Sequence, residues 1–167
     1  MGRRRNNSPL GQSRSQNAMK PEGSMVKQED VTGLAITLKV EDDLSLLVLL
    51  AADGSINRLG TGTINNTEKE MFIGVADPKL FETIRPHIDS DLMRWIGGRA
   101  DQAPRGKICE LTIYLFLPNK EERAIYFKYG SESIGPPPEV SRLVLAAIEI
   151  TNPWYEEFKT GIAKPGA

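Results

Sequence analysis

Residues 108–129 read ICELTIYLFLPNKEERAIYFKY, and this stretch decides the fold class. In both of its halves apolar residues alternate with their neighbours, as in β-strands that bury one face. Between the halves, Pro118 to Glu121 supplies residues that favour a turn. The stretch therefore predicts an antiparallel β-hairpin.

Further strands are predicted earlier in the chain, over residues 34–41, 44–51, 55–60 and 71–75. The first of these alternates as the hairpin does, whereas the second is apolar at nearly every position, which is expected of a strand deep within a sheet. Asp53-Gly54 lies between the second and the third. These residue types tolerate the positive φ values of a type I′ turn, so a second hairpin is predicted there.

Two short helices, or one broken helix, are predicted next. Asp77-Pro78 indicates a helix start, because aspartate accepts from free amide groups of the first turn and proline fits the first helical position. Ser90 is predicted to cap the second helix. Residues 97–107, rich in Gly, Pro and Arg, are then predicted to form a loop.

The C-terminal part is predicted to be helical as well. Apolar residues recur at helical spacing over residues 138–148, so this helix is expected to pack on the sheet. Asn152-Pro153 resembles a cap followed by proline, and it predicts a separate short helix over residues 154–159.

Hairpins, helix, hairpin and helix follow one another along the chain. This order favours an α+β domain in two layers: an antiparallel sheet of hairpins, with about 4–6 strands, packed with helices on one face. Residues 31–167 are predicted to form this single domain. Residues 1–30 are predicted to be a disordered tail, because they hold too few apolar residues to offset the entropy of ordering.

Charge is distributed unevenly between these two parts. Residues 1–30 contain six Lys and Arg against three Asp and Glu, so their net charge is +3 and the rest of the chain carries −4 within the total of −1. An acidic body is a poor surface for nucleic acid, since phosphate binding depends on Lys and Arg. Only the basic tail is predicted to be able to contact nucleic acid or an acidic partner.

The predicted location is the cytoplasm, without a membrane partner. No apolar run approaches the roughly 20 residues that cross a bilayer, and polar residues follow Arg3 to Arg5 where a signal peptide would be apolar. Cys109 is the single cysteine and has no partner for an internal disulfide. At the start of an apolar strand it is predicted to be a small buried hydrophobe.

No catalytic residue, metal site or cofactor is predicted. His87, the one histidine, lies near Asp89 and Asp91 and is the best acid or base candidate. We favour a histidine at a helix end, with the aspartates capping the next turn. The chain also lacks a G-x-S-x-G elbow, a phosphate-binding loop and a dinucleotide fingerprint, and one Cys with one His does not make a zinc site.

Candidate binding residues fall into two groups. Guanidinium and ammonium groups bind carboxylates and phosphates, and aromatic residues are enriched at interfaces. The ligand-binding candidates are Arg94, Arg99, Arg105, Lys107, Asn57, Arg58 and His87. The candidates for an interface with a protein partner or a second copy of the chain are Trp154, Tyr155 and Phe158.

Three functions are compatible with these patterns. We favour a non-catalytic binding or interaction domain, because no nucleophile with a base and no phosphate-binding loop is found. The first alternative is a small-ligand enzyme that uses Asp, Glu or Arg with His87 as its acid or base. The second is an accessory protein whose basic tail contacts nucleic acid or an acidic partner.

Overall fold

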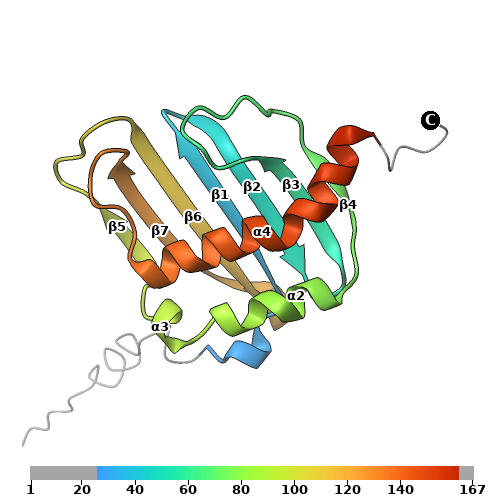
Figure 1. The fold of residues 1–167 in the computed structure, drawn as a ribbon. Coiled ribbons are helices and arrows are strands. Elements are labelled where there is room, and N and C mark those ends of the chain that lie inside the picture. The colour runs from blue at the N-terminus through green and yellow to red at the C-terminus, as the bar shows by residue number, and fades with distance from the viewer. Residues whose placement is uncertain (1–25, 162–167) are drawn as a thin grey trace, which may run out of the picture.

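The computed structural model describes residues 26–161. Seven strands form one sheet in the order β4-β3-β2-β1-β6-β7-β5, and every neighbouring pair except β5 and β7 is antiparallel (Figure 1). The strands are β1 Gly33–Val40, β2 Asp43–Ala51, β3 Ser55–Gly60, β4 Phe72–Val75, β5 Gly97–Ala100, β6 Ile108–Leu117 and β7 Glu121–Gly130. The α+β class and the mostly antiparallel sheet are therefore confirmed, with seven strands in place of about four to six.

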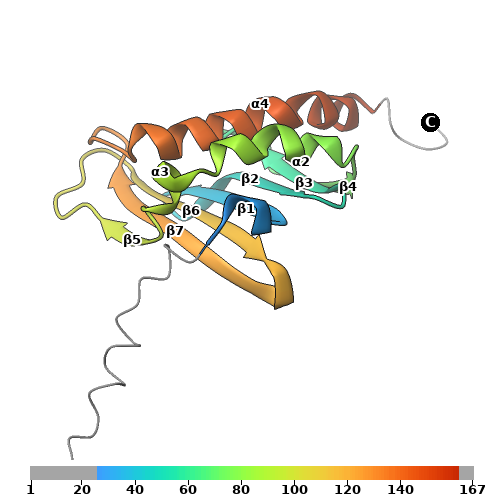
Figure 2. The same ribbon diagram turned by 90° about the horizontal axis from the view of Figure 1, so that it is seen from below.

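The helices all lie along the same side of the sheet, as Figure 2 shows. They are α2 Lys79–Ile84, α3 Ser90–Met93 and α4 Pro138–Thr160. The core fills the space between them and the sheet, because alternate strand residues point towards the helices. Its fully buried members include Leu34, Ile36, Leu46, Val48, Leu50, Ile56, Phe81, Ile84, Ile113, Leu115, Ile125, Leu143 and Ala147.

The type I′ turn predicted at Asp53-Gly54 is not found there. Only Gly54 has a positive φ, of 97°, because the Asp53 carboxylate accepts a hydrogen bond from the Ser55 amide at 2.9 Å and holds a different turn. Two positive φ values, 54° and 69°, occur instead at Glu41-Asp42, between β1 and β2. The predicted hairpin from β6 to β7 has its turn at Pro118–Lys120.

One helix, α4, replaces the two that were predicted around Pro153. Proline removes one backbone donor and normally kinks or ends a helix. Here the chain stays helical because the turn after Pro153 packs on β4: a Cβ added to Gly74 would lie 2.8 Å from the Trp154 ring, and the Phe72 and Phe158 ring centres are 5.8 Å apart.

The predicted loop at residues 97–107 begins with a strand. β5 pairs in parallel with β7, with Arg99 opposite Phe127. Its sequence, Gly-Gly-Arg-Ala, has no alternation of apolar residues that would indicate a strand, and all four residues are exposed. This pairing places β5 at one edge of the sheet and shapes the cleft described below.

The structure describes the last five residues of the segment predicted to be the tail, residues 26–30. Gln28–Asp30, assigned to the tail from the sequence, form a 3₁₀ turn between the half-buried Val26 and the fully buried Val31. The Arg85 guanidinium donates to the carbonyls of Gln28 and Val31, at 3.0 and 2.8 Å. The rest of the predicted tail, residues 1–25, lies outside the described residues.

Candidate binding cleft

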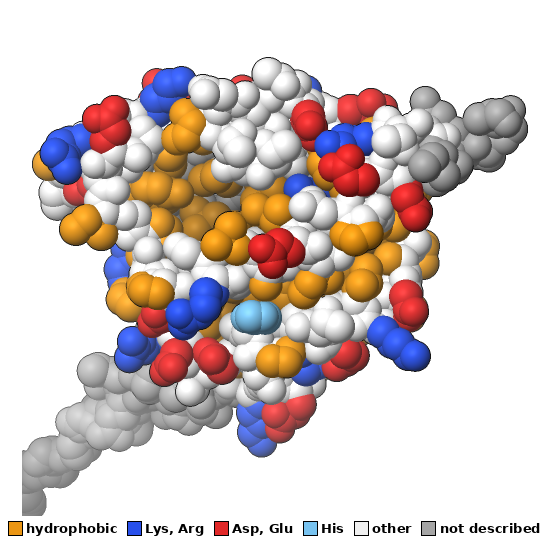
Figure 3. Space-filling model, viewed as in Figure 1, with side chains coloured by type: hydrophobic (Ala, Val, Ile, Leu, Met, Phe, Trp, Pro, Cys, Tyr) orange, Lys and Arg blue, Asp and Glu red, His pale blue; other side chains and the backbone are white. Residues whose placement is uncertain are grey.

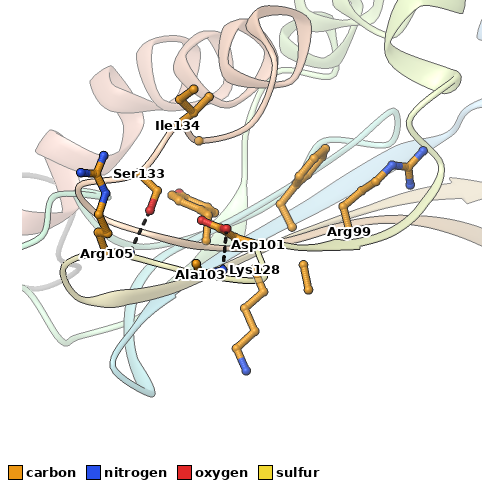
Figure 4. Close-up of a pocket in the computed structure, with 11 residues that line it drawn as sticks. Arg99, Asp101, Ala103, Arg105, Lys128, Ser133 and Ile134 are labelled. Carbon is orange, nitrogen blue, oxygen red and sulfur yellow. Dashed lines mark hydrogen bonds between the residues drawn. The ribbon is translucent and has the colours of Figure 1, made fainter.

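A cleft of about 450 Å³ lies where β5 pairs with β7. This volume is in the range of small-molecule sites. Figure 4 shows the cleft, and its lining comes from β5, from β7 and from the loops that follow each of them. The lining residues are Arg99, Ala100, Asp101, Ala103, Arg105, Phe127, Lys128, Tyr129, Ser133, Ile134 and Gly135.

Hydrogen bonds join the two loops that border the cleft. The Ser133 hydroxyl accepts from the Arg105 amide at 2.8 Å, and the Glu132 amide donates to the Arg105 carbonyl at 2.9 Å. Gly130 allows the loops to come this close, because a Cβ at this position would overlap the backbone of Arg105. These contacts hold the loop after β5 against the loop after β7.

The floor of the cleft is aromatic. Phe127 and Tyr129 alternate with Lys128 on β7, and both rings pack against the core. Burial raises the pKa of Tyr129 to about 12, so its phenol stays neutral at physiological pH. At the rim Ile134 is 94% exposed, which adds apolar surface on the opposite wall (Figure 4).

Two arginines occupy opposite ends of the cleft in Figure 4. The Arg105 guanidinium donates to the Glu132 carbonyl at 3.2 Å, and that of Arg99 lies 5.2 Å from the centre of the Trp95 ring. Within residues 26–161 neither arginine forms an ion pair with a carboxylate. Both cations are consequently available to an anionic ligand.

One carboxylate, that of Asp101, belongs to the lining. Its Oδ1 accepts from the Ala103 amide at 3.0 Å, which fixes the loop after β5. The Lys128 side chain points away from the cleft, to the other side of the ribbon in Figure 4. The charged side chains that border the cleft are thus two arginines and one aspartate.

The other basic candidates are not part of this lining. Arg94 pairs with Glu139 at 3.1 Å, and the Trp95 indole donates to the same carboxylate at 3.0 Å. Lys107 is exposed next to the cleft, and its amide donates to the Ser131 hydroxyl at 2.8 Å. The structure therefore brings together Arg99 and Arg105 and leaves Arg94 and Lys107 outside.

His87 is half-buried in the 3₁₀ turn Arg85–His87, and Figure 3 shows the histidine at the surface near α2. Asp89 accepts from the Leu92 amide at 3.0 Å and so caps α3. Among the described residues no hydrogen bond or ion pair connects His87 with Asp89 or Asp91. The acid-base hypothesis for His87 stays a prediction, without a partner residue that supports it.

Asn57 and Arg58 point to opposite faces of β3. Arg58 is only 1% exposed and lies under α4, where it donates to Thr151 at 3.0 Å and to Asn152 at 2.8 Å. Asn57 is half-buried on the face without helices, opposite Leu49. Neither residue lines the cleft, and Arg58 is inaccessible to a ligand.

The three aromatic interface candidates contact the chain's own sheet. Tyr155 is 1% exposed, and Trp154 and Phe158 are half-buried with their ring centres 4.3 Å apart. Packing of α4 on β4 therefore uses most of their surface. Their predicted role in an interface is not tested by this arrangement.

A second, smaller cavity of about 300 Å³ lies beside the C-terminal half of α4. Its polar groups already bind one another: the Tyr155 hydroxyl donates to Glu68 at 2.8 Å and the Lys159 ammonium does so at 3.1 Å. These contacts outweigh desolvation and lower the pKa of Glu68, with the Tyr155 hydrogen bond as the largest cause. The cavity offers a ligand fewer available charges than the cleft at β5.

Hydrophobic side chains also form the floor of a hollow beside α4 on the helix side of the molecule, as Figure 3 shows.

No helix in residues 26–161 is long and apolar enough to span a bilayer. In the same part of the chain, no three His, Cys, Asp or Glu side chains are grouped as a metal ion would require. No protein family and no curated protein sequence matches this chain.

Proposed function

We propose that this chain is a non-catalytic binding domain whose cleft at β5 takes a small organic acid. The observation that supports the proposal most is that Arg99 and Arg105, without a carboxylate partner, border an aromatic floor. Guanidinium groups bind carboxylates through charge-assisted, two-bond contacts. A ligand with an apolar ring and one or two carboxylates matches this arrangement.

Binding without catalysis is favoured by what the cleft contains. The titratable side chains that border it are Arg99, Arg105, Asp101 and Tyr129, and a buried phenol with a raised pKa is a poor base at neutral pH. Asp101 is already bonded to a backbone amide. His87, the residue of the enzyme hypothesis, is not in the lining.

The experiment is a titration with three ligands that differ only in their anionic groups. Terephthalate has a carboxylate at each end of the ring, benzoate has one, and benzyl alcohol has none. By isothermal titration calorimetry at low salt we expect terephthalate to bind most tightly, benzoate more weakly and benzyl alcohol without measurable heat. Raising the salt concentration is expected to weaken binding of the two acids, because it screens exposed charges.

Arg105→Ala and Arg94→Ala form the matched pair of variants. Loss of a hydrogen bond to a charged group costs about 1.5–3 kcal/mol, so Arg105→Ala is expected to weaken terephthalate binding roughly 10- to 100-fold. Arg94→Ala removes another exposed guanidinium, outside the cleft, and is expected to leave binding unchanged. If none of the acids bound, or if Arg105→Ala bound them as well as the wild type does, the proposal would be wrong.

A further inference from the structure

The guanidinium of Arg99, at one end of the cleft, is held by neutral groups. Within residues 26–161 it forms no ion pair with a carboxylate, and its hydrogen bond to the Gly98 carbonyl is long, at 3.4 Å. Arg105, at the other end, has a shorter bond to the Glu132 carbonyl, at 3.2 Å. An arginine side chain loses rotamer entropy when a ligand orders it, so what holds Arg99 beforehand affects the affinity.

A second neutral contact comes from Trp95, earlier in the same segment. The central carbon of the Arg99 guanidinium lies 5.2 Å from the centre of the Trp95 ring, within the distance at which an aromatic face attracts a cation. Gly97 leaves room for this arrangement, because a Cβ at this position would lie 3.3 Å from Nη1 of Arg99. Its φ of 124° also favours glycine. Residues 95–99 thus fold the arginine back towards the tryptophan.

Trp95 is itself fixed from two sides. Its indole donates to Glu139, in the first turn of α4, at 3.0 Å. Its ring centre lies 5.9 Å from that of Phe127, which belongs to the floor of the cleft. Arg94 is 5.7 Å from the same ring, but its charge is paired with Glu139. Trp95 therefore connects α4 and the cleft floor to Arg99, although it is not part of the lining.

We propose that Trp95 is a positioning residue of the cleft, which holds the Arg99 guanidinium ready for the carboxylate of a ligand. The inference rests on the function proposed for the cleft. An aromatic face attracts a guanidinium without using its N–H donors, so these donors stay available for an anion. A side chain that is already held loses less entropy on binding, and the ligand consequently binds more tightly.

The test is a double-variant cycle, in which calorimetry measures the affinity for terephthalate. Cation–π contacts at exposed sites are weak, so Trp95→Leu is expected to lower the affinity roughly 2- to 5-fold. The same substitution made in Arg99→Ala is expected to have no further effect, because Trp95 acts through Arg99. A purely structural role of Trp95 would lower the affinity equally in both backgrounds.

Two further variants serve as controls for this cycle. Trp95→Phe keeps an aromatic face and is expected to retain most of the affinity that Trp95→Leu loses. Trp154→Leu removes the other tryptophan, which lies next to Gly74 on β4, at the opposite edge of the sheet from β5. This variant is expected to bind terephthalate as the wild type does.

A measurement without ligand checks the contact directly. In the proton spectrum of the wild type, the ring current of Trp95 is expected to shift the Hδ signals of Arg99 upfield, and Trp95→Leu is expected to remove the shift. Far-ultraviolet circular dichroism checks that the variant is folded, and Trp95→Met replaces it if it is not. A wild type without the upfield shift would overturn the inference, whichever variants fold.

The outcomes distinguish this inference from the proposed function. A wild type that does not bind terephthalate would make both wrong. If the wild type binds, two results would overturn the role of Trp95 alone: a Trp95→Leu variant that binds as tightly as the wild type, or a loss of affinity that is equally large in the Arg99→Ala background.

Discussion

The guanidinium of Arg58 lies 4.3 Å from the centre of the Tyr155 ring, so a buried cation joins β3 to the C-terminal half of α4. Both side chains are 1% exposed. Around them, the Arg58 nitrogens donate to the Gly60 carbonyl, and the Gly60 amide donates to the Tyr155 hydroxyl at 2.9 Å. A charged residue thus takes a core position because its donors find backbone and side-chain acceptors.

Arg58→Met is expected to lower the free energy of unfolding by about 2–4 kcal/mol, because it leaves the buried acceptors of Gly60 and Thr151 without this donor. Urea denaturation followed by fluorescence measures the loss. Arg142→Met, at an exposed position of α4, is the control and is expected to change stability by less than about 0.5 kcal/mol. Equal effects of the two substitutions would show that the buried network contributes nothing specific.

Stability should depend on the ionisation of Glu68. Its pKa lies below the ordinary 4.5 in the folded chain, because the Tyr155 hydroxyl and then Lys159 donate to the charged form. The carboxylate therefore stabilises the fold above pH 4.5, and this contribution is lost as the pH falls through the lowered pKa of the folded state. Glu68→Gln is expected to be less stable than the wild type at neutral pH.

The pH series distinguishes this effect from a general loss of packing. Urea midpoints of both proteins, measured from neutral pH down into the acid range, should converge as Glu68 becomes protonated. A difference that stays constant through pH 4.5 and below would mean that the charge of Glu68 has no part in the stability.

Gly130→Ala tests how the cleft is held together. The added methyl group overlaps the backbone of Arg105, so the loop after β5 is expected to separate from the loop after β7. Hydrogen exchange of the Lys107 and Glu132 amides should then become faster, and binding of terephthalate should be lost. Gly135→Ala is the control in the same cleft, because its Cβ would only touch the Tyr129 ring at 3.5 Å. Unchanged exchange in Gly130→Ala would contradict the account.

Cys109 is expected to be unreactive in the folded protein. It is 2% exposed, and burial, together with the nearby charge of Glu41, raises the pKa of its thiol. Reaction with a thiol reagent such as Ellman's reagent should be slow in buffer and become fast in urea. Rapid labelling without denaturant would show that the thiol of Cys109 is not buried.

The sequence predicts the parts of this fold that depend on local patterns. The hairpin over residues 108–129 is one of them, since both strands alternate and the turn lies between them. β5 is missed because its four exposed residues pair in parallel with a strand more than twenty positions later. The helix break predicted at Pro153 is wrong for a related reason: the contacts that keep α4 helical come from β4, far away in the sequence.

The cleft could be anticipated only in part. A cluster of arginines near Gly97 points to anion binding, and two of them, Arg99 and Arg105, do line the cleft. The aromatic floor was not anticipated, because Phe127 and Tyr129 look like ordinary strand residues until β5 is paired beside them. For Arg58 the sequence pattern suggests the wrong environment. A polar residue on a short strand suggests exposure, but α4, which is distant in sequence, covers this side chain.

The most direct test of the central claim is a two-dimensional ¹⁵N–¹H spectrum of the full chain during titration with terephthalate. Binding at the cleft predicts progressive shifts for amides of residues 98–105 and 127–135, with little change for α2 and for β4. The same titration of Arg99→Ala with Arg105→Ala should leave the spectrum unchanged. Shifts that gather around Glu68 and Lys159, or no shifts at any concentration of the wild type, would contradict a binding site between β5 and β7.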